Sequence, residues 1–486
     1  MRVQMLKSLI TPTEPVPAIR LGRVHFTGIG GAGMSGIARI MLARGIGVSG
    51  SDAMPSALLD DLSVHGARVY VGHASANLGD LGAGDTLVLS SAIRPDNPEL
   101  VEATRRGMRI MHRAAALASV MAGRRVIAVA GTHGKTTTTS MLTTVLREVG
   151  ADPGYVIGGI LNETGLGAED GAGADFVAEA DESDGSFLLL SPDVAVITNV
   201  EADHLDNYQS LAEIESAFAS FGRRVSSLVL TCADDPGAEA VAARLDPQRV
   251  RRYGESSGAD YRLGDVRSQG LAVSFAVTAD RSPSGEIFAQ ITVHVPGRHN
   301  ALNATAAFAA AVELGFAPSQ VAAALAGYRG ARRRMELKGE ADGVRVFDSY
   351  AHHPTELAAD LRAARDIVGP PDAGRAAGRV IAVFQPHLYS RTRIFASDFG
   401  TALGLADEAV VLDVYAARED PEPGVTGGLV ADAVPGGRAR FLPDRSQAAP
   451  LIARIAEPGD VVLTMGAGDV TALGPQLVEA IGRRRG

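Results

Sequence analysis

Short apolar runs alternate with amphipathic stretches along the first half of the chain. We predict strands for the apolar runs, which lie at residues 24–28, 46–52, 86–93, 126–130, 175–181 and 194–200. The stretches at 34–45 and 212–222 repeat apolar residues with the period of a helix. Strands that alternate with helices are typical of α/β proteins with parallel sheets. The pattern therefore predicts an α/β fold.

The pattern changes twice towards the C-terminus. Residues 228–295 contain short strand signals, and a glycine loop then leads into an alanine-rich helix at 299–314. After residue 328, four apolar strands each run into a polar loop, in the segments 344–356, 379–393, 408–419 and 460–470. Such loops lie at the carboxyl edge of a parallel sheet, where α/β proteins bind ligands. We predict three domains, at residues 1–122 (with a loose leader at 1–22), 123–331 and 332–486.

The composition excludes several classes of protein. The chain has 486 residues, of which 46% are hydrophobic and 21% charged, and its net charge of −10 argues against nonspecific nucleic-acid binding. Its single cysteine, Cys232, excludes an intramolecular disulfide and a cysteine-rich metal site. The chain has neither a signal sequence nor an apolar run of about eighteen residues. We therefore predict no membrane insertion and a cytoplasmic location.

Residues 131–137, Gly-Thr-His-Gly-Lys-Thr-Thr, follow the apolar strand at 126–130 and open a helix. A glycine turn there directs backbone N–H groups and Lys135 at phosphate oxygens, and leaves Thr136 able to hold Mg²⁺. Only three of the 46 lysine and arginine residues are lysines, Lys7, Lys135 and Lys338. A compact ammonium suits a nucleotide phosphate. We therefore predict a phosphate loop, rather than a glycine turn before an ordinary helix.

A second glycine loop lies near the N-terminus. Gly28, Gly30, Gly31 and Gly33 follow a strand and open a helix, and Asp52 ends the next strand. This spacing is typical of dinucleotide binding, in which the glycines allow close approach of a diphosphate and the carboxylate meets a ribose hydroxyl. Taken alone, it would indicate an NAD-dependent oxidoreductase. The geometry requires only a diphosphate, however, and a UDP-sugar supplies one equally well.

Two acidic segments follow strands of the predicted central domain. Residues 179–184 contain Glu179, Asp181, Glu182 and Asp184, which suit hard-cation coordination next to a phosphate loop, although a solvated acidic loop is the simpler reading in isolation. The segment at 198–206 places Asn199, Glu201, Asp203 and His204 where a second metal or the γ-phosphate would lie. Their position beside the phosphate loop favours a metal site.

Further polar groups lie at helix starts and strand ends in the last third. His299, Asn300 and Asn303 begin the alanine-rich helix, where a single asparagine is explained by capping. Arg332, Arg333 and Arg334 form a run that is usually a solvated face. The loops at 348–356 and 385–393 bring histidines and arginines to strand ends: His352, His353, His387, Arg391 and Arg393. Forked guanidiniums suit carboxylates and phosphates, and histidines suit anion binding or proton handling.

Taken in order, these segments resemble the Mur ligase family, the ATP-dependent amino-acid-adding enzymes of peptidoglycan synthesis. The resemblance rests on GIGGAGMSGIA, GTHGKTTTT, EADESD, TNVEADHLD, GRHNALNA, DSYAHHPTE, QPHLYSRTR and MGAGDV. It implies a Rossmann-like UDP-binding domain, a central P-loop ATPase α/β domain and a C-terminal Rossmann-like domain. It also implies that ATP activates a muramoyl carboxylate as an acyl phosphate, which an amine attacks. GIGGAGMSGIA and DSYAHHPTE point to the branch that joins L-alanine to UDP-N-acetylmuramate.

The resemblance also assigns roles to residues. The catalytic residues would be Lys135, Glu179, His204, His352 and Arg391. Thr136, Glu179 and His204 would hold Mg²⁺ at one or two sites, with Mn²⁺ as a substitute. The ATP-binding residues would be Gly131, Thr132, His133, Gly134, Lys135, Thr136, Thr137, His299, Asn300, Asn303, Arg333 and Asp348. The residues that bind UDP-N-acetylmuramate and alanine would be Gly30, Gly31, Gly33, Asp52, Ser90, Ser91, His112, Arg113, Tyr350, His352, His387 and Arg391. We expect a monomer or a weak homodimer.

The chain departs from the family pattern in places. No lysine lies between Lys135 and Lys338, so the carbamylated lysine of several relatives is impossible here. Met335 replaces the usual phenylalanine, and Leu388 stands where many relatives have arginine. Three alternatives remain: a peptide-recycling muropeptide ligase of the same family, an NAD-dependent oxidoreductase, and a nucleotide switch or motor.

Overall fold

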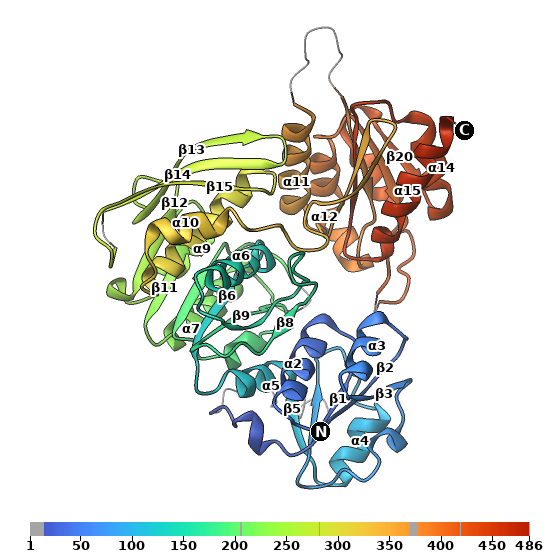
Figure 1. Cartoon of the computed structure of the whole chain (residues 1–486). Coiled ribbons are helices and arrows are strands. Elements are labelled where there is room, and N and C mark those ends of the chain that lie inside the picture. Colours follow the sequence, from blue (N-terminus) through green and yellow to red (C-terminus); the bar gives the residue numbers. More distant parts are fainter. Residues whose placement is uncertain (1–13, 205–206, 281, 370–377, 418, 486) are drawn as a thin grey trace. The chain divides into compact units, whose positions relative to one another are not determined.

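The computed structural model describes residues 14–204, 207–280, 282–369, 378–417 and 419–485. Its strands form three sheets of five, ten and six strands, with helices between them, which confirms the predicted α/β class (Figure 1). The chain divides into two compact units. The first consists of Met1–Gly264, Val277–Ala289 and Asn303–Gly327, and the second of Asp265–Ala276, Gln290–Leu302 and Tyr328–Gly486.

The first sheet has the strand order β3-β2-β1-β4-β5, and all of its pairs are parallel. The strands are β1 (Val24–Thr27), β2 (Val48–Asp52), β3 (Arg68–Val71), β4 (Thr86–Leu89) and β5 (Arg109–His112). The helices between them are α2 (Ala32–Ala43), α3 (Ala57–Val64), α4 (Pro98–Arg105) and α5 (Arg113–Met121). The strand order reverses at β1, and ligands bind in α/β proteins outside the carboxyl ends of strands at such a switch point. The glycine loop, which follows β1, lies there.

The second sheet has the order β15-β14-β13-β12-β11-β10-β6-β9-β7-β8. Its strands are β6 (Arg125–Ala130), β7 (Gly154–Val156), β8 (Ala168–Glu169), β9 (Asp175–Glu179), β10 (Val194–Ile197), β11 (Leu228–Cys232), β12 (Val250–Gly254), β13 (Tyr261–Gln269), β14 (Ala272–Ala279) and β15 (Ile287–Val293). Its helices are α6 (Lys135–Glu148), α7 (Leu211–Arg224), α8 (Pro236–Ala242), α9 (Arg298–Glu313) and α10 (Pro318–Leu325). Parallel registers pair Val129 with Glu179 and Ala130 with Ile197. The phosphate loop and both acidic segments therefore begin at the same edge.

The third sheet has the order β16-β17-β21-β18-β19-β20. Its strands are β16 (Glu336–Ala341), β17 (Val344–Ser349), β18 (Val380–Phe384), β19 (Glu408–Leu412), β20 (Ala439–Leu442) and β21 (Val461–Met465). Its helices are α11 (Pro354–Val368), α12 (Tyr389–Leu403), α13 (Gly427–Ala433), α14 (Ala448–Ile455) and α15 (Leu473–Gly482). The neighbours Val346 and Phe347 belong to different core clusters, because successive side chains of a strand point to opposite faces. Both faces of this sheet are therefore buried under helices.

The predicted elements are found, with shifts of a few residues at their ends. The helix predicted at 34–45 is α2, and the one predicted at 299–314 is α9. Strands β3, β5, β7, β8, β16 and β20 have no counterpart among the predicted elements. Short 3-10 helices lie at Ala18–Arg20, Ser75–Leu78, Ser186–Leu189, Pro247–Arg249, Pro435–Gly437, Arg445–Gln447, Asp469–Ala472 and Arg483–Arg485. In the described part of the chain, no helix is long and apolar enough to cross a membrane.

The end of the predicted leader is not loose. Residues 1–13 lie outside the described residues, but Ala18–Arg20 form a 3-10 helix and Leu21 is fully buried. The carbonyl of Leu21 accepts a hydrogen bond from the Thr86 hydroxyl at 2.6 Å. A Cβ on Gly22 would lie 2.1 Å from the Gly84 carbonyl oxygen. Burial of one leucine and a close backbone approach therefore fix this segment, although it lacks periodicity.

Candidate active site

The phosphate loop connects β6 to α6 and contains two glycines. Any other residue at either position would be strained. Gly131 has a φ of +137°, and a Cβ there would lie 2.0 Å from the Thr198 hydroxyl oxygen. Gly134 has a φ of +79°, and its Cβ would lie 2.7 Å from the side-chain oxygen of Asn303. Both backbones are in the left-handed region, and both approach a polar side chain closely. Asn303, predicted to face the nucleotide, therefore lies against the phosphate loop.

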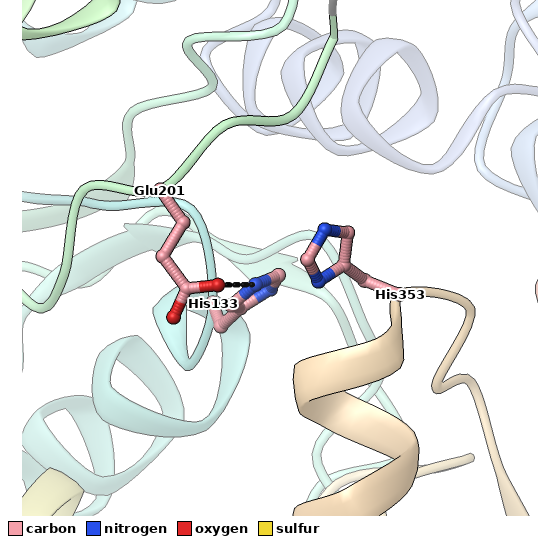
Figure 2. Close-up of side chains that lie close together, drawn as sticks. All are labelled: His133, Glu201 and His353. Carbon is pink, nitrogen blue, oxygen red and sulfur yellow. Dashed lines mark ion pairs between the residues drawn. The ribbon is translucent and has the colours of Figure 1, made fainter. Parts of the chain in front are cut away.

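The segment after β10 fixes the conformation of this loop. The side chain of Asn199 accepts a hydrogen bond from the His133 amide at 2.8 Å and donates one to the His133 carbonyl at 3.0 Å. The Glu201 amide donates to the Thr132 hydroxyl at 2.9 Å, and the Thr198 hydroxyl donates to the His133 carbonyl at 2.5 Å. The imidazole of His133 faces the carboxylate of Glu201, with 3.5 Å between Nε2 and Oε2 (Figure 2). The beginning of this acidic segment therefore supports the loop.

Lys135 is the first residue of α6, and oxygens surround its ammonium group. Its Nζ donates to the Gly131 carbonyl at 2.6 Å and lies 2.8 Å from Oε2 of Glu182. Burial disfavours the charged lysine, but the carboxylates of Glu182 and Asp181 outweigh burial and raise the pKa of Lys135. These contacts favour the charged ammonium, and an incoming phosphate would have to share it with Glu182 or take the place of Glu182. Sequence reasoning placed Glu182 in the acidic loop without finding this partner.

Thr136 and Glu179, two of the residues predicted to hold Mg²⁺, contact each other, and their binding of a metal stays a prediction. The Thr136 hydroxyl donates to Oε1 of Glu179 at 3.2 Å, and Oε2 of Glu179 accepts the Gly158 amide at 2.8 Å. A hydroxyl and a carboxylate beside a phosphate loop fit a hard divalent cation. Gly158 and Gly159 were missed by sequence reasoning: their Cβ atoms would lie 2.7 Å from Oε1 of Glu179 and 2.9 Å from the Thr136 methyl group. In the sequence, the two adjacent glycines were the one feature that could have indicated this close approach.

His204 lies next to the same acidic residues. Its φ is +52°, and its Nε2 lies 3.7 Å from Oε1 of Glu182 and 3.7 Å from Oδ2 of Asp203. The buried carboxylate of Asp203 accepts the His204 amide at 2.7 Å. Residues 205–206, which end the predicted motif, lie outside the described residues. Coordination of a second metal by His204 stays a prediction.

The glycine loop of the first domain is held by a carboxylate. Oδ2 of Asp52 accepts a hydrogen bond from the Gly30 amide at 2.9 Å. Gly31 is the N-cap of α2, and a Cβ on Gly33 would lie 3.7 Å from the Arg113 guanidinium. One oxygen of Asp52, the residue predicted to meet a ribose, is therefore engaged with the loop itself.

Ser91, His112 and Arg113 gather around the acidic segment of the central domain. Arg113 donates to Asp181 at 2.6 Å, and the Ser91 hydroxyl donates to Asp184 at 2.8 Å. Nε2 of His112 lies 3.3 Å from Oδ2 of Asp184. The predicted sugar-nucleotide residues of the first unit lie at or just after the ends of β1, β2, β4 and β5: Gly30, Gly31, Gly33, Asp52, Ser90, Ser91, His112 and Arg113. Residues 179–184 thus contact both this group and the phosphate loop.

In the second unit, Asp348 orients Arg333. The Asp348 side chain is fully buried, and its Oδ1 and Oδ2 accept hydrogen bonds from the hydroxyls of Thr464 at 2.7 Å and Thr471 at 2.6 Å. Nε of Arg333 lies 3.3 Å from Oδ2 of Asp348, and Nη2 donates to the Gly466 carbonyl at 2.5 Å. Both residues were predicted to reach the nucleotide. The contacts make Asp348 a support for Arg333, whose own contact with ATP stays a prediction.

Aromatic and imidazole rings line the loops at the carboxyl edge of the third sheet. Ring centroids lie 5.3 Å apart for Tyr350 and His352, and 6.1 Å apart for His352 and His387. Tyr415, missed by sequence reasoning, stacks on His387 at 5.7 Å. Arg391 is buried in the first turn of α12. The predicted substrate residues Tyr350, His352 and His387 are therefore neighbours.

The polar residues at the start of α9 make different contacts. Asn300 donates from its side chain to the Pro296 carbonyl at 2.7 Å, a local contact that anchors the helix start. Nε2 of His299 lies 3.8 Å from Oδ1 of Asp360, and burial lowers the pKa of His299 to about 4. His299 is therefore neutral near pH 7. Asp360, a further residue missed from the sequence, accepts a hydrogen bond from the Ser349 hydroxyl.

Comparison with known proteins identifies the family. Three family models match the chain: Mur ligase family, catalytic domain, at residues 23–125; Mur ligase middle domain, at 129–311; and Mur ligase, glutamate ligase domain, at 333–468. The chain belongs to the Mur ligase family. It is therefore a ligase, and the first glycine loop does not make it an oxidoreductase.

Individual Mur ligases are similar over nearly the whole chain. The UDP-N-acetylmuramate–L-alanine ligase of Thermobifida fusca is 58% identical over 478 residues, which cover 98% of this chain and 100% of the relative. The crystal structure of UDP-N-acetylmuramate–alanine ligase from Thermotoga maritima matches with a TM-score of 0.77 at 30% identity, covering 94% of this chain and 98% of that one. A murein peptide ligase from Psychrobacter arcticus gives a TM-score of 0.68 at 27% identity, over 95% of this chain and 99% of that one.

Proposed function

We propose that this Mur ligase uses ATP to join L-alanine to the lactyl carboxylate of UDP-N-acetylmuramate, the first amino-acid addition to the peptidoglycan precursor. One observation supports this most directly: the acidic segment 179–184 contacts the phosphate loop through Glu182 and the predicted sugar-nucleotide residues through Asp181 and Asp184. A diphosphate-binding loop and an ATP loop share this segment. The identity of 58% to a UDP-N-acetylmuramate–L-alanine ligase supports the choice of substrates.

The residues of the site fit transfer of a phosphoryl group to a carboxylate. The carboxylate oxygen attacks the γ-phosphorus of ATP, which forms an acyl phosphate and releases ADP; the alanine amine then attacks the carbonyl carbon, loses a proton and displaces phosphate. Two anions meet in the first step, so the charged Lys135 neutralises developing phosphate charge. Thr136 and Glu179 would hold Mg²⁺, for which Mn²⁺ would substitute, and His204 a second ion; the metal would neutralise further phosphate charge. Correct positioning of the substrates supplies the remaining rate acceleration, and no side-chain nucleophile is needed.

The loops of the second unit supply groups for the other substrates. Tyr350, His352, His387 and Arg391 would surround the muramoyl carboxylate and alanine, since guanidinium and imidazole groups suit carboxylates. Arg333, held by Asp348, would meet the nucleotide. We place the reaction in the cytoplasm, in a monomer or weak homodimer.

A phosphate-release assay over a panel of substrates tests the proposal. Release from ATP should require both UDP-N-acetylmuramate and L-alanine, and the product should be UDP-N-acetylmuramoyl-L-alanine by mass. The similarity to a murein peptide ligase makes a preformed peptide the main competitor. Product with a tripeptide but none with saturating L-alanine would replace our proposal by peptide recycling. Phosphate release that ignores both substrates would indicate a nucleotide switch or motor instead.

A further inference from the structure

A buried carboxylate lies at the strand ends that carry the first glycine loop. Glu99 is in the first turn of α4, and its side chain is fully buried. Burial of an ionised carboxylate is strongly unfavourable unless the group is paired and hydrogen-bonded. Glu99 belongs to none of the sequence motifs, and the reaction described above gives it no part.

Donors from three separate segments surround this carboxylate. Its Oε2 accepts hydrogen bonds from the hydroxyls of Ser51 at 2.7 Å and Thr27 at 2.8 Å. Its Oε1 accepts the Asn77 side-chain amide at 2.7 Å, and Nε2 of His25 lies 3.3 Å from Oε2. Burial opposes ionisation, but the interactions with His25 and Ser51 outweigh it and lower the pKa of Glu99 to about 2. The group is therefore a fixed negative charge at neutral pH.

Two of these donors are next to the residues that shape the glycine loop. Thr27 ends β1 and is followed directly by Gly28, whose amide donates to the Ser51 carbonyl at 2.8 Å. Ser51 is followed by Asp52, whose carboxylate accepts the Gly30 amide. The contacts with Glu99 therefore tie together the two chain segments that set the direction of the loop amides.

We propose that Glu99 is a positioning residue for the sugar-nucleotide site. Its carboxylate fixes the ends of β1 and β2, and the amides of Gly28 and Gly30 bond to β2 residues, so the loop at 28–33 already has a defined path into α2 when the diphosphate binds. Such a defined path strengthens binding because less order has to be created in the complex. The enclosed Glu99 acts through Thr27 and Ser51 and does not touch the substrate. The inference rests on the proposed function, which supplies the diphosphate.

Titration of two ligands into the full-length protein tests this role. Glu99→Gln keeps the shape of the side chain but removes its charge, so the Kd for UDP-N-acetylmuramate should rise about tenfold. The Kd for ADP and the kcat should stay within about twofold, because the phosphate loop does not depend on Glu99. Glu102→Gln is the matched control. Glu102 lies one turn further along α4 and forms ion pairs with Arg105 and Arg106. This variant should leave both Kd values unchanged.

Two outcomes for Glu99→Gln would overturn the inference: unchanged sugar-nucleotide binding, or an equal weakening for both ligands, which indicates a general loss of structure. Should this variant not fold, Thr27→Val removes one donor while keeping the charge, and about threefold weaker sugar-nucleotide binding is expected. Unchanged binding by Thr27→Val would then overturn the inference. A wild-type protein that binds ADP but not UDP-N-acetylmuramate would instead contradict the proposed function, and the wild-type titration alone reveals this.

Discussion

The two glycine loops of the first unit both follow a parallel strand and open a helix, yet they are built differently. The loop at 131–134 leads directly into Lys135, and residues 198–201 hold its backbone and side chains. The loop at 28–33 contains no cation in its sequence; a carboxylate, Asp52, holds one of its amides, and the guanidinium of Arg113 lies beside Gly33. The first arrangement suits stabilisation of charge that develops during phosphoryl transfer, and the second suits binding of a diphosphate that does not react. We therefore propose that the same local fold serves chemistry in one place and binding in the other.

Removal of Lys135 should produce the largest effect. We expect Lys135→Ala to lower kcat about 10³-fold, because the ammonium neutralises charge that develops in the transition state. Steady-state phosphate release measures this, with circular dichroism as the check on folding. Lys338→Ala is the matched control, since Lys338 pairs with Glu336 on β16 and should tolerate the change. A near-normal rate for Lys135→Ala would refute the assignment of the phosphate loop.

Removal of the Thr136 hydroxyl should come next. Thr136→Val keeps the size of the side chain but loses the oxygen that meets Glu179, so kcat should fall about 10²-fold. Thr136→Ser keeps the oxygen and should retain most of the activity. The ratio of the two rates, measured over a range of Mg²⁺ concentrations, isolates the contribution of the hydroxyl. Equal rates for both variants would show that Thr136 holds no metal.

Loss of Arg113 should affect binding rather than chemistry. Arg113→Ala removes a cation beside the glycine loop, and KM for UDP-N-acetylmuramate should rise about tenfold to a hundredfold, with little change in kcat. Initial-rate kinetics with each substrate varied in turn measure this. Arg105→Ala, at an exposed ion pair on α4, serves as the control. A fall in kcat without a change in KM would remove the distinction between the two loops.

The smallest effect is expected at Asp52. Asp52→Ala deletes the acceptor of the Gly30 amide, and loss of this one hydrogen bond within the protein should raise KM for UDP-N-acetylmuramate about twofold to tenfold. Asp52→Asn keeps an oxygen acceptor and should remain within about twofold of the wild type. If Asn proves as damaging as Ala, the charge of Asp52 matters, and a direct contact with the sugar nucleotide becomes the better explanation.

The phosphate loop was predictable because its determinants are local. A buried strand, Gly131, Gly134 and Lys135 lie within ten residues, and their order fixes the geometry. The glycine loop at 28–33 was recognisable for the same reason. Strands β16 and β20, by contrast, are edge strands whose sequences carry no long apolar run.

Contacts between distant residues could not be predicted in this way. Glu99 is 72 residues from Thr27, and its burial follows from the packing of α4 rather than from any motif. Tyr415 becomes a partner of His387 only once β18 and β19 pair. Leu21 is buried although its neighbours show no periodicity. In each case the tertiary structure creates an environment that the local sequence does not encode.

The most direct test of the division between the two loops is the affinity of Lys135→Ala for the sugar nucleotide. We would titrate UDP-N-acetylmuramate into the wild-type protein and into this variant by calorimetry, without ATP. If the loop at 28–33 binds the diphosphate and Lys135 serves the chemistry, the two Kd values should agree within about twofold while the variant shows almost no turnover. A Kd weakened as strongly as the turnover would contradict the account, because Lys135 would then bind the sugar nucleotide itself.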